Sequence, residues 1–306
     1  MIEGEPLLEL LRELKTRDYR FAAVTPETHA RVLARPLRSA PTLRDIFGWN
    51  RHFDDDQIDR KILEMLRSSG AIEKADGRLR SWVRVASLGG ELFLHSPFPT
   101  TSPDSVFFGP DTQRFVRFVS DEIRSLESPR RIVDMGSGSG AGGILAAKAA
   151  GSPRLTLVDV NPLAADFASI NCRSADVQAD VVVGNDVPHG CEVVIANPPY
   201  MIDGAHRLYR DGGSLYGGEL AFDWAQRSLA ALAEGGTLLL YTGAAVIDGK
   251  APLLEKIRGL TEAAEARLQA TEIDPDVFGE ELGRPEYGNV ERIAVYGIKI
   301  TKRTAP

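Results

Sequence analysis

The sequence has few cysteines and no long apolar run. Only Cys172 and Cys191 occur among its 306 residues, and they do not form a Cys-x-x-Cys pair. A disulfide framework and a thiolate zinc site are therefore not expected. The five histidines are scattered without metal-ligand spacing, so we expect no metal. No segment approaches the roughly 18 apolar residues of a membrane-spanning helix, and the acidic, amphipathic N-terminus does not resemble a signal peptide. These absences predict a soluble cytoplasmic protein with no membrane partner.

The charge balance is acidic. Forty-three Asp and Glu residues against 36 Lys and Arg residues give a net charge of −7, which disfavours a nucleic-acid partner, although a local basic face can still bind one. Hydrophobic residues make up 43% and charged residues 26% of the chain, as in ordinary globular proteins. The length favours two domains; the oligomeric state is left open.

The first hundred residues predict short helices followed by a strand pair. Gly89-Gly90 suits a tight hairpin turn between two strands, and three arginines between residues 78 and 84 lie where phosphate contact is conceivable. A packing or partner-docking role is the favoured interpretation, because the chain is acidic. We expect helices at 3–15, 28–34, 42–47 and 55–68 and strands at 79–86 and 91–95. This order predicts a winged-helix-like domain over residues 1–100, followed by a second domain over 101–306.

After residue 128, apolar strands alternate with helices, as in a parallel α/β sheet. Each predicted strand ends in glycine or polar residues, which places those residues at the carboxyl edge of the sheet, where open α/β folds bind ligands. Asn161-Pro162 supplies a helix cap and a first-turn proline. The expected strands are 131–134, 155–160, 181–183, 193–196, 237–241 and 293–300, and a helix is expected at 219–233.

A glycine-rich loop follows the first of these strands. Gly136, Gly138 and Gly140 allow a sharp turn and a close approach to a ligand, and the next helix offers free N–H groups. Gly138-x-Gly140-x-x-Gly143 also satisfies the dinucleotide fingerprint, so an NAD-dependent oxidoreductase and a ligand-free turn remain alternatives.

Acidic and amide side chains at neighbouring strand ends narrow the range of possible ligands. Asp159, about 20 residues past the loop, suits a ribose diol, which dinucleotides and S-adenosylmethionine share. Asp134 faces the loop and suits a cationic ammonium group better than a pyrophosphate; a turn-capping acid is the alternative. Asn185 and Asp186 can accept from an adenine amine, and they are also common in turns.

The tetrapeptide Asn197-Pro198-Pro199-Tyr200 follows a buried strand and carries the acceptor chemistry. Pro198 keeps Asn197 out of the helical region, and two successive prolines donate no N–H, so the turn is stiff and presents acceptors. An N–H₂ group can donate to the Asn197 side-chain oxygen and to the Pro198 carbonyl. Tyr200 offers a π-face to a planar substrate. The alternative is a rigid structural turn.

These motifs, in this order and spacing, resemble the class I S-adenosylmethionine-dependent N-methyltransferases of the HemK/PrmC type, the family that methylates a glutamine of peptide release factors. Phe108-Gly-Pro110-Asp111-Thr112 is similar to the segment before the family's catalytic domain, and Arg210-Asp211-Gly-Gly is similar to a stretch after the catalytic turn. Gly109 departs from the family's usual arginine. The N-terminal part is more similar to a bacterial branch in which a winged-helix-like segment precedes the HemK-like domain.

The resemblance implies a seven-stranded class I methyltransferase fold, S-adenosylmethionine as cofactor and in-line methyl transfer to nitrogen. It places Asp134, Gly136, Gly138, Gly140, Asp159, Asn185, Asp186, Phe108 and Thr112 around the cofactor, Asn197, Pro198 and Tyr200 at the acceptor nitrogen, and Arg210 and Asp211 at the substrate. For those last two residues, a salt bridge within the loop is an equal alternative.

Because no obviously basic side chain lies beside the acceptor motif, a planar N–H₂ group is favoured as the acceptor. Three classes of acceptor remain. A protein glutamine comes first, through the resemblance. An RNA or DNA exocyclic amine (adenine N6 or guanine N2) comes second, and a small-molecule amine or amide third. A regulator that senses the cofactor without turnover is the non-enzyme alternative, and the intact acceptor motif argues against it.

Overall fold

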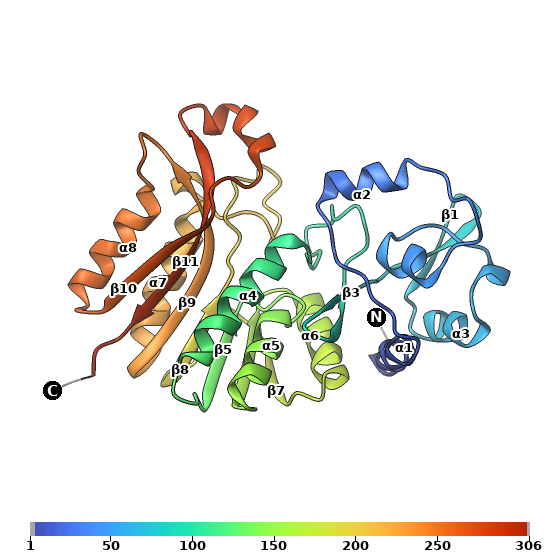
Figure 1. The fold of residues 1–306 in the computed structure, drawn as a ribbon, viewed down its shortest axis with the longest axis horizontal. Coiled ribbons are helices and arrows are strands. Elements are labelled where there is room, and N and C mark those ends of the chain that lie inside the picture. Colours follow the sequence, from blue (N-terminus) through green and yellow to red (C-terminus); the bar gives the residue numbers. More distant parts are fainter. Residues whose placement is uncertain (1–3, 305–306) are drawn as a thin grey trace.

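The computed structural model describes residues 4–304 and centres on a seven-stranded sheet (Figure 1). The strand order is β10-β11-β9-β8-β5-β6-β7. β11 runs antiparallel to both of its neighbours, and the pairings from β9 to β7 are parallel. The strands are β5 (Arg131–Met135), β6 (Arg154–Asp159), β7 (Ala179–Val183), β8 (Cys191–Ala196), β9 (Leu232–Val246), β10 (Arg267–Asp274) and β11 (Arg292–Thr301). This confirms the predicted class I methyltransferase fold.

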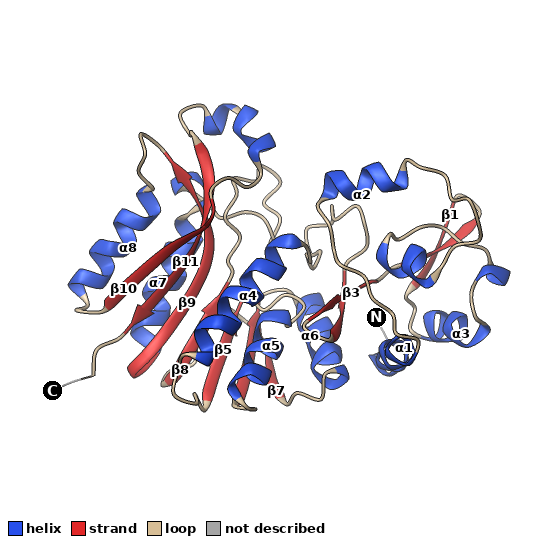
Figure 2. Ribbon diagram, in the orientation of Figure 1, coloured by secondary structure: helices blue, strands red, loops and turns tan. Residues whose placement is uncertain are grey.

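Helices cover both faces of the sheet, with α4 and α5 in front of the strands and α7 behind them (Figure 2). Successive strand residues point to opposite faces: Ile132 packs in the core on the α4 and α5 side, and Val133 packs in the core that contains α7 and α8. Because both faces are covered, the central strands are largely apolar. The helices are α4 (Pro110–Arg124), α5 (Ala141–Ala150), α6 (Pro162–Ser174), α7 (Glu219–Ala231) and α8 (Pro252–Ala263).

The N-terminal part contains helices and two separate hairpins. One hairpin pairs β1 with β2, and the other pairs β3 with β4 across Gly89-Gly90. Its elements are α1 (Gly4–Thr16), α2 (Pro26–Leu33), a π-helix (Arg44–Gly48), a 3₁₀ turn (Asp55–Gln57), α3 (Arg60–Ser68), β1 (Ile72–Ala75), β2 (Arg78–Ser81), β3 (Arg84–Leu88) and β4 (Glu91–His95). Glu3, the predicted start of the first helix, lies outside the described residues.

The single strand predicted at 79–86 is wrong. Ser81 ends β2, and its hydroxyl donates to the Val83 carbonyl at 2.6 Å, closing a turn before β3 begins. The backbone N–H of Trp82 donates to the Ala71 carbonyl at 2.9 Å. A local side-chain bond of this kind competes with strand pairing, so the apolar run divides between two sheets.

The three arginines of this region bind other parts of the protein. Arg78 pairs with Asp54 at 3.1 Å and Arg80 with Glu73 at 3.2 Å. Arg84 is buried and donates to a backbone carbonyl, and burial lowers its pKa to about 10. These side chains therefore stabilise the N-terminal part and do not form a free face for phosphates.

The N-terminal part packs against α6. Leucines of α1 share one core with Ala164, Phe167 and Ile170 of α6. The buried Asn171 accepts from the backbone N–H of Leu94 at 2.9 Å and donates to the carbonyls of Leu94 at 3.2 Å and Ser139 at 2.8 Å. These bonds join β4, α6 and the glycine loop.

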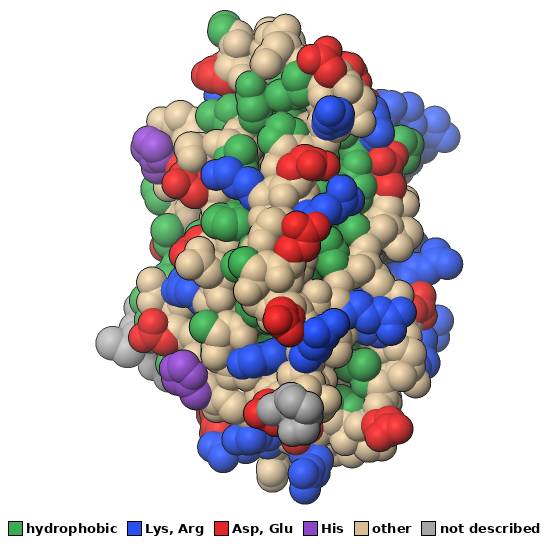
Figure 3. Space-filling model, turned by 90° about the vertical axis from the view of Figure 1, so that its left-hand side faces the viewer, with side chains coloured by type: hydrophobic (Ala, Val, Ile, Leu, Met, Phe, Trp, Pro, Cys, Tyr) green, Lys and Arg blue, Asp and Glu red, His purple; other side chains and the backbone are tan. Residues whose placement is uncertain are grey.

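The outer edge of the sheet is formed by β10, whose residues are mostly exposed. Acidic and basic side chains are interspersed over this side of the molecule (Figure 3). Arg292 pairs with Glu272 at 2.9 Å and Arg114 with Asp274 at 2.8 Å. Charged side chains discourage edge-to-edge pairing with another sheet. Between residues 4 and 304 no helix has the length and apolar character needed to cross a membrane.

Candidate active site

A cavity of about 780 Å³ lies at the carboxyl ends of β5, β6, β7 and β8. It brings together most of the residues that the sequence assigns to the site, from segments between 112 and 211. These wall residues are Thr112, Gly136, Gly138, Asp159, Asn185, Asn197, Pro198, Tyr200, Arg210 and Asp211. Asp134, Gly140, Asp186 and Phe108 lie off the wall. The glycine loop and the acceptor motif therefore face one shared space.

The glycine loop runs through left-handed backbone at Gly136, Gly138 and Gly140, with φ of 66°, 53° and 78°. Glycine adopts this conformation without the penalty that other residues carry. The Gly138 N–H donates to the Asp159 carboxylate at 2.8 Å, and a Cβ at Gly138 would meet no atom within 4 Å. The loop therefore presents bare backbone to the cavity.

The Asp159 carboxylate is fixed at the end of β6. One oxygen accepts from Gly138, and the other accepts from the Asn161 N–H at 2.9 Å. Burial raises the pKa of Asp159, and these two backbone bonds oppose the rise. Each oxygen keeps a further lone pair, so the side chain can still accept from a hydroxyl in the cavity.

Asp134 lies behind the loop. It is 1% exposed and accepts from the Gly143 N–H at 2.7 Å, near the start of α5. Burial raises its pKa to about 7, the Gly143 bond lowers it, and the charge of Asp159 raises it further. This geometry supports the start of α5; a direct contact with a cofactor ammonium group stays a prediction.

Phe108 is 3% exposed and stacks on Phe93 and His95, with ring centroids 5.7 and 5.2 Å apart. Its neighbour Phe107 lies on the cavity wall and stacks on Tyr209 at 6.4 Å. The sequence contained two adjacent aromatics and no signal that distinguished them. Side chains one residue apart in an extended segment point to opposite sides, and here the inward position falls on Phe107.

Of the two polar residues predicted after β7, one lies on the cavity wall and the other does not. Asn185 lies on the wall, and its backbone carbonyl accepts from Arg227 at 2.7 Å. Asp186 is exposed and lies off the wall. Gly140 caps the start of α5, where its N–H donates to the Ser137 carbonyl at 2.7 Å.

The acceptor motif forms a corner after β8 and opens on the cavity. Asn197 is half-buried, and Tyr200 is 6% exposed. The Tyr200 ring fits over Gly243 of β9, where a Cβ would lie 2.3 Å from the ring. Close packing of this kind fixes the ring, so the corner has one geometry. The Tyr200 hydroxyl is buried and has no hydrogen-bond partner within residues 4–304.

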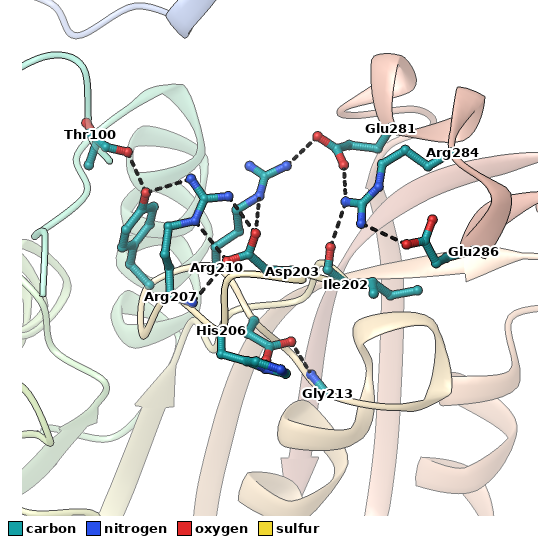
Figure 4. Close-up of polar contacts among 12 residues, drawn as sticks. Thr100, Ile202, Asp203, His206, Arg207, Arg210, Gly213, Glu281, Arg284 and Glu286 are labelled. Carbon is teal, nitrogen blue, oxygen red and sulfur yellow. Dashed lines mark hydrogen bonds and ion pairs between the residues drawn. The ribbon is translucent and has the colours of Figure 1, made fainter. Parts of the chain in front are cut away.

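Residues 202–213, here called the bridging loop, connect the N-terminal part with the segment 280–286 (Figure 4). Asp203 accepts from the Arg207 side chain at 2.8 Å. Arg210 pairs with Glu281, and Arg284 donates to the Ile202 carbonyl at 2.8 Å. These contacts make Arg210 part of a salt-bridge network on the cavity wall.

The bridging loop contacts the N-terminal part of the protein at Thr100. The Tyr209 hydroxyl donates to the Thr100 carbonyl at 2.5 Å. Asp211 contacts His206 at 2.5 Å and accepts from the Gly213 N–H at 3.2 Å. The loop therefore forms one side of the acceptor end of the cavity.

Sequence reasoning missed several wall residues. Asp111 belongs to the motif at 108–112, which assigns it no role, although its side chain is 8% exposed and bonded to Tyr241. Phe278, whose ring lies 6.1 Å from that of Tyr200, comes from a polar segment without a motif. Only the fold brings such distant residues together.

The groups that the cavity wall presents at the glycine loop fit S-adenosylmethionine. The bare Gly138 backbone leaves room for a close approach, and the Asp159 carboxylate suits a ribose diol. Ser137 also lies on the wall, and its buried hydroxyl has no partner in the described part of the chain. In that same part, no three His, Cys, Asp or Glu side chains gather in a way that could hold a metal ion.

Comparison with known proteins gives consistent results. Residues 113–245 match the model of the family described as "Methyltransferase small domain". The chain is 26% identical over 300 residues to a "Release factor glutamine methyltransferase" of Deinococcus radiodurans, covering 90% of this chain and 96% of that protein. A protein of the same description from Rhodopirellula baltica is 25% identical over 174 residues, covering 50% and 59% of the two chains.

Among solved structures, wild-type Trm5b from Pyrococcus abyssi superposes with a TM-score of 0.50 at 15% identity, covering 80% of this chain and 68% of that one. At this identity the similarity concerns the fold alone.

Proposed function

Given that this chain is a class I S-adenosylmethionine-dependent methyltransferase, we propose that it methylates a planar nitrogen, and that its acceptor is the side-chain amide of a protein glutamine. The observation that carries the proposal is the corner at 197–200, which faces the same cavity as the glycine loop. The proposal includes the HemK/PrmC type, a winged-helix-like part at 1–100 and a catalytic domain at 101–306.

The corner restrains the acceptor nitrogen. The Asn197 side-chain oxygen and the Pro198 carbonyl each accept one N–H, and Pro198 and Pro199 offer no competing donor. When bound, S-adenosylmethionine supplies a methyl group on an already activated sulfonium. The residues of the chain therefore contribute mainly orientation and exclusion of water, which can account for a large part of a rate enhancement.

The charges on the cavity wall favour a polypeptide over a nucleic acid. Each arginine on the wall has a carboxylate partner: Arg207 pairs with Asp203, Arg210 with Glu281 and Arg227 with Asp223. Glu27 and Glu280 form exposed parts of the same wall. Phosphate binding relies on available Lys and Arg side chains, and this wall offers an acidic surface instead.

The relatives named for release factors support glutamine as the acceptor. An exocyclic amine of RNA, at adenine N6 or guanine N2, is the second candidate, because the same corner can hold either planar N–H₂ group.

The test is transfer of label from methyl-labelled S-adenosylmethionine to three separate acceptors: a purified bacterial peptide release factor, total RNA, and a small-molecule extract. We expect label in the release factor, on a glutamine identified by peptide mass spectrometry. The same reaction with Asn197→Ala protein controls for contaminating activity. Label confined to RNA would overturn the glutamine proposal and leave nitrogen methylation intact.

A further inference from the structure

A buried acid lies behind the acceptor corner. Asp111, the second residue of α4, is 8% exposed and lies on the cavity wall. The Tyr241 hydroxyl, from the middle of β9, donates to its Oδ1 atom at 2.7 Å. This bond joins residues 130 positions apart in the sequence and ties the start of α4 to the centre of the sheet.

The surroundings of Asp111 consist mainly of hydrogen-bond donors. Burial raises its pKa, whereas Tyr241, Tyr200, Arg114 and the Asn197 side chain all lower it. The charge of Asp111 in turn helps to keep the pKa of Tyr200 well above its ordinary value, after burial, so this phenol stays protonated. A carboxylate has about four lone-pair sites, enough to accept from the Tyr241 hydroxyl and from the Asn197 amide.

The position of Asp111 in a helix does not explain this environment. Acids are favoured in the first turn of a helix because of the helix dipole, but that effect requires neither burial nor a tyrosine partner. The capping bond at this helix start is made by Thr112, whose hydroxyl oxygen accepts from the Gly109 N–H at 3.3 Å. Buried carboxylates are costly unless hydrogen-bonded, so keeping an acid here lowers stability unless its partners compensate.

We propose that Asp111 is a positioning residue for the acceptor corner: its carboxylate accepts an N–H from the Asn197 amide and so turns the Asn197 side-chain oxygen toward the cavity. This inference rests on the proposed role of Asn197 in nitrogen methylation. The Tyr241 hydroxyl holds the carboxylate in place through its 2.7 Å bond.

The physical reason is the two-sided character of an asparagine amide. Its oxygen and its N–H₂ group have nearly the same shape, so packing alone does not select between the two orientations. An ionised carboxylate can only accept, which excludes the orientation that would point the Asn197 N–H₂ group at an incoming N–H₂ group. A chain of hydrogen bonds also polarises its members, so the Asn197 oxygen becomes a stronger acceptor.

The test combines an acceptor-independent readout with turnover. Asparagine side chains labelled with ¹⁵N are observed by NMR in the wild type and in Asp111→Asn, with the Asn197 signals assigned by their loss in Asn197→Ala. Asparagine at 111 can donate as well as accept, so we expect the Asn197 N–H₂ signals to shift. Asp121→Asn, on the exposed surface of the same helix, is the matched control and should leave them in place.

In methyl transfer to the release factor, we expect Asp111→Asn to lower kcat about tenfold, with unchanged S-adenosylmethionine affinity by calorimetry. Tyr241→Phe should lower kcat less, because the carboxylate remains. Unchanged Asn197 signals in Asp111→Asn would overturn the inference. Shifted signals together with a wild-type protein that does not label the release factor would refute the proposed acceptor and leave the inference standing.

Discussion

Replacing Gly138 with alanine tests whether the glycine loop presents bare backbone to the cofactor. A Cβ at this position would meet no protein atom within 4 Å, and Gly138 lies on the cavity wall. The added methyl group therefore costs nothing in packing within the protein, and it occupies space next to the Asp159 carboxylate that the cofactor would use.

Two separate effects are expected. The left-handed backbone at Gly138, with φ of 53°, makes alanine unfavourable by about 1 kcal/mol. Overpacking a close contact by one methyl group costs roughly 1–3 kcal/mol, which corresponds to about a fivefold to 150-fold loss of S-adenosylmethionine affinity.

Gly77 provides a matched control. It lies in the turn between β1 and β2, has φ of 76° and also has open space where a Cβ would lie, but it is not a wall residue. Urea unfolding without cofactor should show a similar loss of stability for both alanine variants. Calorimetric titration with S-adenosylmethionine should show a loss of affinity for Gly138→Ala alone. Wild-type affinity in Gly138→Ala would refute the assignment of this loop to the cofactor.

Three further predictions follow from the contacts of individual side chains. Asn197→Ala should keep S-adenosylmethionine affinity by calorimetry and lose about a hundredfold in turnover because the acceptor is misplaced; equal turnover would contradict its role. The pKa of Asp134, raised from 3.8 to about 7 in the folded protein, gives stability that is complete below about pH 4 and lost as the pH rises toward 7. Relative to Asp134→Asn, which does not titrate, the wild type should therefore lose up to about 4 kcal/mol across this range in urea unfolding, and a constant difference would argue against burial as the cause. Asn171→Ala removes the partner of the Leu94 N–H, the Leu94 carbonyl and the Ser139 carbonyl. The free energy of unfolding should therefore fall by about 2–4 kcal/mol in urea unfolding, and a fall of less than about 1 kcal/mol would mean that water replaces the lost bonds.

The sheet centre was predictable because its strands are apolar on both faces and end in polar or glycine residues. Asn161 caps α6 as expected, accepting from the Leu163 N–H at 3.0 Å. β10 was not predicted. Its sequence, RLQATEID, is mostly polar and exposed on both faces, so it carries neither an apolar run nor a clean alternation, and pairing with β11 alone defines it as a strand.

The site was predictable as far as its motifs reach along the sequence. Adjacent residues could not be assigned to the wall or to the core, as Phe107 and Phe108 show. The role of Asp111 depends on Tyr241, which lies within an apolar strand and has no local signal. Long-range bonds of this kind are set by topology, and a single sequence does not reveal them.

The shared core between α1 and α6 limits how this enzyme can change over evolutionary time. The helix that begins just after Asp159 presents Ala164, Phe167 and Ile170 to the leucines of α1. If an unrelated module replaced the N-terminal part, this hydrophobic surface of α6 beside the cofactor site would be exposed to solvent. Exposed apolar patches promote aggregation. New acceptor preferences are therefore easier to acquire by substituting single wall residues of the N-terminal part, such as Glu27 and Phe98, than by replacing the whole N-terminal part.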